Sequence, residues 1–221
     1  MEYSWDFGAL TPYAALIGKG LWITVVYTVT TALAGLAIGL VAGVLRTTGP
    51  RWVSIPIVAY IEIFRCTPLL VQLVWMYYAL PVLVQMEMSP GMACFLTLTL
   101  YGGAFYAEIF RGGIEAVDRG QWEAGRALGM RRGRIFRRLI LPQAVRVMIP
   151  SLINQTVLQL KNTSLVSTVA VGDLLYQGSV ITAAIYRPLE VYTVVAVLYF
   201  VVLFPLTLGA TRLEKRLGAH R

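Results

Sequence analysis

The sequence has few charged residues for its length. Asp, Glu, Lys and Arg together make up 14% of its 221 residues, whereas ordinary globular chains carry roughly 25%. Apolar residues reach 57%. This composition argues against a soluble domain and predicts an all-α integral membrane protein with long apolar helices.

Residues that carry metal and thiol chemistry are also scarce. The two cysteines, Cys66 and Cys94, lack CxxC spacing, and His220 is the single histidine. We therefore expect no metal site and no thiol catalysis, and we interpret each cysteine as a small apolar packing residue. The phosphate-binding pattern GxxxxGK[ST] is absent as well, so the chain itself is not expected to hydrolyse ATP or to contain catalytic residues.

The charge that is present is mostly positive, with a formal net charge of +8. The basic residues gather in short segments beside apolar runs, and aromatic residues do not alternate with them as in a base-stacking surface. We therefore expect no nucleic-acid partner. Cytoplasmic loops of membrane proteins carry an excess of Lys and Arg, which explains the clusters.

Uncharged runs divide the chain into membrane spans. A transmembrane helix needs about 20 apolar residues, and residues 88–107, for example, contain no charged residue. Residues 52–66 are interrupted by charges and are predicted to form a membrane-surface helix, and residues 171–189 an outer loop with short helical pieces. The whole chain, 1–221, is predicted to be one transmembrane domain with five spans at about 17–45, 68–84, 89–110, 144–168 and 189–211.

The distribution of basic residues predicts the orientation. With five spans and the C-terminal tail inside, sixteen of the nineteen Lys and Arg residues lie on or near the cytoplasmic side. Only Lys19 and Arg187 then lie outside, and Lys161 lies within a span. We therefore predict the N-terminus outside and the C-terminus inside.

The first span carries a glycine pattern. Gly35, Gly39 and Gly43 are four residues apart, and small residues at this spacing let membrane helices approach closely. This pattern is weak evidence for a dedicated dimer motif. We interpret it as helix packing, either within the chain or with a partner.

Four segments together point to a known family. They are EIFRCTPLLVQL (62–73), AEIFRGGIEAVDRGQWEAGRALGM (107–130), LILPQAVRVMIP (139–150) and KNTSLVS (161–167). In this order and spacing the chain resembles the permease subunits of ABC importers of the polar amino-acid type, which carry histidine, glutamine, glutamate or arginine. The resemblance covers nearly the whole chain and implies the fold of a type I importer permease.

The resemblance assigns residues 111–143 to the cytoplasmic EAA loop, on which a separate ATPase subunit docks. Nine arginines lie between residues 111 and 146, against three acidic residues. We expect two short helices, with Gly129 at the end of the first and Pro142 at the start of the next helix. A lipid-bound amphipathic loop is the alternative. The predicted coupling residues are Gln121, Trp122, Glu123, Ala124, Gly125, Leu128, Gly129 and Pro142, with Ala124 and Gly125 allowing close approach of the partner and Trp122 and Leu128 serving as apolar anchors.

A substrate path is predicted with less support from the residues. Polar and ionisable groups in membrane segments are costly and so mark candidate sites. Many relatives carry Asp where this chain has Asn162, so a neutral or acidic amino acid is favoured over a cationic one, and Lys161 suits a substrate carboxylate. The predicted path residues are Glu62, Arg65, Gln72, Gln159, Lys161, Asn162, Thr163 and Ser164.

Structural interpretations of the same residues remain open. The alternative for Lys161 is snorkelling to the outer interface or pairing within the protein, and the alternative for Glu62 and Arg65 is an i,i+3 ion pair. Gln72 and Gln159 fit interhelical hydrogen bonds equally well. Glu108 and Arg111 repeat the i,i+3 spacing and are interpreted as a structural pair.

The resemblance implies a multi-pass protein of the bacterial inner membrane that works by alternating access. Its expected partners are two copies of an ATP-binding subunit, a second permease as a homodimer or heterodimer, a periplasmic or surface amino-acid-binding protein, the amino acid and membrane lipid. No cofactor is expected in this chain, because ATP and Mg would be bound by the ATPase. An ATP-independent channel or scaffold with a lipid-binding basic loop is the alternative function.

Overall fold

The computed structural model describes the backbone of residues 3–218 and the side chains of residues 3–213. Every regular element in this part of the chain is helical, as the sequence predicts. The elements are η1 (Phe7–Tyr13), α1 (Ala14–Thr48), α2 (Arg51–Cys66), α3 (Leu69–Tyr78), α4 (Leu80–Val84), α5 (Pro90–Glu115), α6 (Arg119–Ala127), α7 (Arg132–Ile135), η2 (Phe136–Ile140), α8 (Leu141–Asn162), η3 (Thr163–Val169), α9 (Leu174–Ile185) and α10 (Pro188–Gly218).

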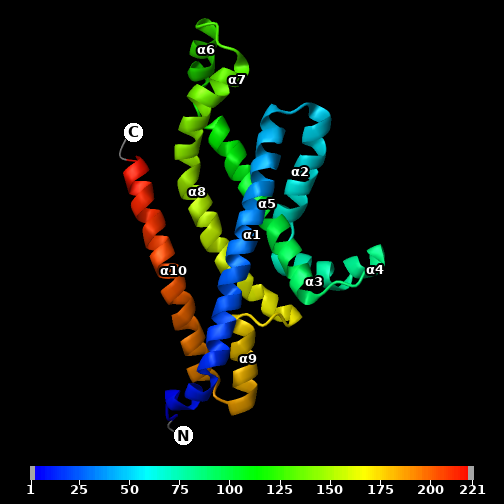
Figure 1. The fold of residues 1–221 in the computed structure, drawn as a ribbon, viewed down its shortest axis with the longest axis vertical. Coiled ribbons are helices and arrows are strands. Elements are labelled where there is room, and N and C mark those ends of the chain that lie inside the picture. Colours follow the sequence, from blue (N-terminus) through cyan, green and yellow to red (C-terminus); the bar gives the residue numbers. More distant parts are fainter. Residues whose placement is uncertain (1–2, 219–221) are drawn as a thin grey trace.

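Helices α1 and α5 form the central pair of the bundle (Figure 1). A Cβ atom placed on Gly39 would lie 2.9 Å from the carbonyl oxygen of Gly103, and one on Gly43 would lie 2.7 Å from that of Ala107. The two backbones therefore pack against each other with no room for side chains. The glycine pattern of the first predicted span is thus used for packing within the chain.

Helix α2 runs back along α1 and packs on α1 and α5 (Figure 1). Ile61 is fully buried there, and the hydroxyl group of Tyr60 donates a hydrogen bond to the carbonyl oxygen of Leu100, at 2.6 Å. The prediction of a membrane-surface helix at residues 52–66 is therefore wrong. Its Glu62 and Arg65 suggested an interfacial helix, but the structure pairs these charges with each other and with a carboxylate on α5.

The chain bends sharply after α2. Helices α2 and α3–α4 meet at an angle of 107°, so residues 68–84 do not continue the direction of the bundle. The cause is Pro68, which disfavours helical backbone at the preceding residue. Thr67 is accordingly extended, with φ −112° and ψ 143°.

A second bend follows α8. The helix continues beyond Asn162 as the 3₁₀ segment η3 and then turns by 45° into α9. Helix α9 packs against α1 and α10 and buries Leu174 and Ile181. Residues 174–185 therefore form a packed helix, whereas the sequence suggested only a loop with short helical pieces.

By length and composition, three helices among the described residues are apolar enough to cross a membrane, and counting each bent pair as one span gives up to five. This agrees with the five spans expected. The N-terminal segment lies at one end of the bundle, and α6 and α7 lie at the other end (Figure 1). Helix α10 starts near the N-terminal segment and runs towards the end that carries α6 and α7.

Candidate functional site

The polar loop forms a compact projection, which we call the knob and define as α6, α7 and η2 (residues 119–140). Asp118 caps α6 by accepting a hydrogen bond from the backbone N–H of Gly120, at 2.7 Å. Gly129 ends the helical stretch with φ +69°, a conformation that favours glycine. The N–H of Met130 then donates to the carbonyl oxygen of Gly125, at 3.0 Å. The two short helices and the left-handed Gly129 that the sequence predicts are therefore present.

Three of the predicted coupling residues hold the knob together. A Cβ atom on Gly125 would lie 2.8 Å from the side chain of Ile135, which is fully buried. The prediction that Gly125 leaves room for a partner is therefore wrong, because it leaves room for α7. Trp122 packs into the same cluster and lies 6.4 Å from Phe136, centroid to centroid. Gln121 accepts a hydrogen bond from Gln143 of α8, at 3.4 Å.

Other coupling residues are exposed. Glu123, Ala124 and Gly129 are exposed, and 78% of Leu128 is accessible, so none of its apolar surface gains much from packing within the chain. A second protein that covered Leu128 would remove from water apolar surface that the chain leaves exposed. The outer face of the knob thus combines Glu123, Ala124 and Leu128.

Pro142 lies in the first turn of α8, as predicted, but the helix does not begin afresh there. Residues 136–140 form a π-helical turn in which the N–H of Leu141 donates to the carbonyl oxygen of Phe136. Proline has no N–H and its ring crowds the carbonyl group four residues earlier, which a π-helical turn relieves. The knob is therefore continuous with α8.

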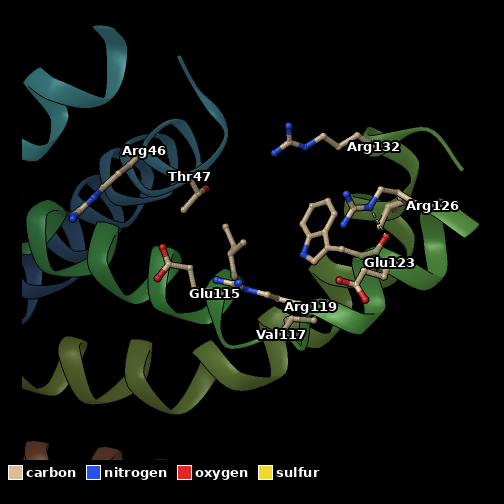
Figure 2. A pocket seen from close by; sticks show the side chains of 11 residues that line it. Arg46, Thr47, Glu115, Val117, Arg119, Glu123, Arg126 and Arg132 are labelled. Atoms are coloured by element: carbon tan, nitrogen blue, oxygen red, sulfur yellow. Dashed lines mark hydrogen bonds between the residues drawn. The ribbon is translucent and has the colours of Figure 1, made fainter. Parts of the chain in front are cut away.

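A cavity of about 980 Å³ lies between the knob and the ends of α1 and α5 (Figure 2). We call it the basic cavity. Its apolar lining consists of Ile114, Val117, Trp122 and Ile135. Its charged and polar lining consists of Arg46, Thr47, Glu115, Arg119, Glu123, Arg126 and Arg132.

Next to this cavity, the carboxylate of Glu108 forms ion pairs with three arginines from three helices. Glu108 of α5 contacts Arg46 of α1, Arg111 at 2.8 Å and Arg65 of α2 at 3.6 Å. Only 15% of its side chain is exposed. The predicted structural pair of Glu108 and Arg111 is confirmed. The ion pair between Arg46 and Glu108 was not predicted, because an arginine at the end of a span is expected at a membrane boundary without any partner.

Arg65 is held more loosely than the other members of this cluster. It lies 3.8 Å from Glu62 and 3.6 Å from Glu108, and its side chain is 36% exposed. Its guanidinium carbon also lies 5.8 Å from the ring centroid of Phe105. The predicted i,i+3 pair of Glu62 and Arg65 is therefore present, but both residues retain access to solvent or to a ligand.

The two glutamines predicted on the substrate path have structural partners. The side-chain amide of Gln72 donates to the carbonyl oxygens of Phe64 and Thr67, at 2.9 and 3.0 Å, and so bridges the bend between α2 and α3. Gln159 is fully buried and donates to Thr31 of α1 at 3.1 Å and to the carbonyl oxygen of Leu98 of α5 at 2.8 Å. These contacts fit the interpretation of Gln159 as an interhelical hydrogen bond.

The remaining path residues lie where α8 passes into η3. Lys161 is exposed, Asn162 is half-buried and Thr163 is buried. Ser164 donates to the carbonyl oxygen of Lys161, at 2.8 Å. Segment η3 packs against α3 through Val166 and Leu69, so the two bends of the chain meet. Among the described residues no hydrogen bond or ion pair joins this group to Glu62 or Arg65.

A charged cluster at the opposite end of the bundle was not found from the sequence. Glu190 of α10 is fully buried and accepts hydrogen bonds from Tyr3, from the N–H of Asp6 at 3.0 Å and from Arg187 at 2.9 Å. The hydrogen bond to Glu190 raises the pKa of Tyr3. The i,i+3 spacing of Arg187 and Glu190 was the available signal. The cluster fastens the N-terminal segment to α10.

Comparisons with known proteins agree with this arrangement. Residues 35–219 match the family described as "Binding-protein-dependent transport system inner membrane component". The chain is 37% identical over 219 residues to the glutamine transport system permease of Escherichia coli K12, which covers 98% of this chain and 99% of that protein. It is 33% identical over 218 residues to the arginine transport system permease of Bacillus subtilis 168, with 97% and 98% covered.

Two solved structures have a similar fold. A crystal structure of an amino acid ABC transporter with histidines superimposes with a TM-score of 0.90 at 33% identity, and the match covers 97% of this chain and 100% of that one. An inward-facing structure of the methionine ABC transporter gives a TM-score of 0.77 at 24% identity, with 94% and 98% covered. The second likeness concerns the fold alone.

Proposed function

Because this chain belongs to the family of inner-membrane components of binding-protein-dependent transport systems, we propose that it passes a polar amino acid inward by alternating access, driven by ATP through the knob. It is a permease subunit of the polar amino-acid ABC importer type, and in this family a separate subunit hydrolyses ATP. Membership also implies an ATPase, a binding protein and a second permease as partners.

Coupling through the knob rests on one observation above all, which is that the knob projects from one end of the bundle (Figure 1) and exposes Leu128, at 78%, beside Glu123 and Ala124. An ATPase that covers this face gains apolar burial that the isolated chain does not. Two ATPase subunits, each with ATP and Mg, would draw together and move two such knobs. Because the knob is continuous with α8, its movement would be transmitted along α8 to the second bend.

We place the substrate path at the two bends. Broken membrane helices at a bundle's midpoint expose backbone groups that can serve a ligand. Arg65 lies between two carboxylates at 3.6 and 3.8 Å, so a substrate carboxylate can compete for its guanidinium group while Glu62 receives the substrate ammonium group. Gln72 lies at the first bend, and Lys161, Asn162, Thr163 and Ser164 lie at the second. We assign Gln159 to helix packing.

A neutral or acidic substrate is proposed over a cationic one. Asn162 contributes no negative charge, and Lys161 disfavours a nearby cation.

The assembly that follows contains two permeases, as a homodimer or heterodimer, in a bacterial inner membrane. The N-terminus would lie outside, where the binding protein delivers the amino acid. The knob and the C-terminus would lie in the cytoplasm. The opposite positions of the N-terminus and the knob along the bundle support this orientation (Figure 1).

Uptake in proteoliposomes tests the proposal. The permease is purified with its ATPase, ATP is enclosed, and the binding protein is added outside with radiolabelled glutamine, glutamate, arginine or histidine. We expect uptake only with ATP, and glutamine or glutamate ahead of arginine. Uptake that does not depend on ATP would contradict the proposal of an ATP-driven importer and would favour an ATP-independent channel. ATP-dependent uptake that prefers arginine would overturn only the substrate assignment.

A further inference from the structure

The basic cavity holds more positive charge than the chain itself neutralises. Of its four arginines, Arg46 is paired with Glu108. Of its two glutamates, Glu115 is paired with Arg111, at 2.5 Å. Among the described side chains, the remaining three arginines have no carboxylate within 4.0 Å. They are Arg119, Arg126 and Arg132 (Figure 2).

Glu123 is the only other carboxylate in the lining, so the cavity keeps an excess of two positive charges. Three guanidinium groups around one hollow surface focus the electrostatic field and attract an anion. Guanidinium groups bind carboxylates with two parallel hydrogen bonds, and arginine is therefore typical of sites that recognise them.

The floor of the cavity is apolar and well packed. Ile135 is fully buried, and Val117 and Ile114 are only 6% and 8% exposed. Trp122 lines the same cavity. Tryptophan and arginine around a packed apolar centre are the residues that dominate binding at protein interfaces. The lining therefore fits a segment that carries apolar and acidic side chains together.

The position of the cavity favours a protein partner. Its volume of about 980 Å³ is at the upper end of the range of roughly 300–1,000 Å³ for small-molecule sites, and it has room for several side chains. Residues of α6 contribute both to this cavity and to the outer face with Leu128. A subunit that covers the outer face is thus within reach of the cavity.

We propose that the basic cavity receives an acidic segment of the ATPase subunit, with at least two carboxylates and one apolar side chain. This inference rests on the proposed function, since it names the chemistry of the partner that covers the knob. The carboxylates bind Arg126 and Arg132 near the opening, and the apolar side chain packs on Trp122. The cavity lies between α1, α5 and the knob, so its occupant ties both parts of the permease to the ATPase.

Charge reversal inside and outside the cavity tests the proposal. The double variant Arg126→Glu/Arg132→Glu changes the cavity, and Arg137→Glu/Arg138→Glu makes the same change of charge on exposed residues of the knob that do not line it. The dissociation constant of the ATPase from the full permease is measured in nanodiscs of neutral lipid. We expect the cavity variant to weaken binding about 100-fold and the control less than about threefold.

A milder variant and a rescue identify the partner segment. Arg126→Gln/Arg132→Gln removes the charge without reversing it, and we expect about a tenfold loss. Acidic residues of the ATPase are then changed to Lys one at a time, and at least one change should restore binding to the Arg126→Glu/Arg132→Glu permease. Thermal melting of each permease variant confirms that it is folded.

Three results would overturn the inference. Equal losses in the cavity variant and the control would mean that only the general charge of the knob matters. No loss in the cavity variant would mean that the cavity is not used. A loss seen only in nanodiscs with anionic lipid would assign the arginines to lipid. If the unmodified permease bound no ATPase at all, the proposed function itself would fail.

Discussion

The seam between α1 and α5 and the knob both depend on glycine, but they differ in what they leave unsatisfied. In the seam, Gly39 brings two backbones together, and Gln159 donates both amide hydrogens within the chain, while its Oε1 is buried without a hydrogen-bond partner among the described residues. In the knob, Gly125 brings α6 onto α7, yet Leu128 remains exposed and three arginines have no carboxylate partner among the described side chains. The seam is therefore closed by packing within the chain, whereas the knob leaves apolar and positively charged groups available to a partner.

Filling the seam should have the largest effect. In Gly39→Leu the new Cβ would lie 2.4 Å from the Cβ of Tyr106 and 2.9 Å from a backbone oxygen, so α1 and α5 must separate. We expect a loss of about 3 kcal/mol in stability, measured by thermal melting in detergent. Gly18→Leu on the same helix is the control, because a Cβ there has open space, and it should change stability by less than about 0.5 kcal/mol. Equal effects would mean that the seam is not tightly packed.

Truncating the exposed leucine of the knob should affect association and not stability. Leu128→Ala removes apolar surface that the chain does not bury, so the melting temperature should stay unchanged. Binding of the ATPase should weaken by about 1–3 kcal/mol, measured as a dissociation constant. Val82→Ala on α4, where the side chain is 76% exposed, is the matched control and should leave ATPase binding unaltered. A loss of stability in Leu128→Ala without a loss of binding would reverse the assignment of this residue.

The smallest effect is expected for the buried amide between the helices. Gln159→Leu removes two interhelical hydrogen bonds, and we expect about 1 kcal/mol of destabilisation, or roughly 2–4 °C in melting temperature. The KM for uptake should stay within about twofold, because Gln159 packs helices. A large change in KM with unchanged stability would mean that Gln159 contacts the substrate.

Much of the fold could be predicted from the uncharged runs. Helices α1, α5 and α10 follow directly from them, because a long apolar helix has little alternative in a membrane. Helix α2 was misplaced because Glu62 and Arg65 look unsuited to a packed helix, and the neutralising Glu108 lies 43 residues beyond Arg65 along the chain. Such a pairing between distant residues leaves no local pattern.

In the knob, the turn could be predicted from the sequence, but the packing of α6 against α7 could not. Gly129 has a local requirement, a positive φ, which the sequence expresses at that position. Gly125 has a tertiary requirement, contact with Ile135, and the same residue type gives no sign of which neighbour needs the space. The basic cavity likewise depends on how α1 meets the knob, since Arg46 and Arg132 are far apart in the sequence.

The central claim is that the knob links ATP hydrolysis to transport, and a single variant tests it most directly. Glu123→Arg changes an exposed residue that belongs to the outer face, also lines the basic cavity and does not hold the knob together. ATP hydrolysis and amino-acid uptake are measured in the same proteoliposomes, together with the amount of ATPase that remains bound. If the knob couples ATP hydrolysis to transport, binding-protein-stimulated hydrolysis and uptake should fall together as the ATPase dissociates. Normal, ATP-dependent uptake by this variant would contradict the central claim.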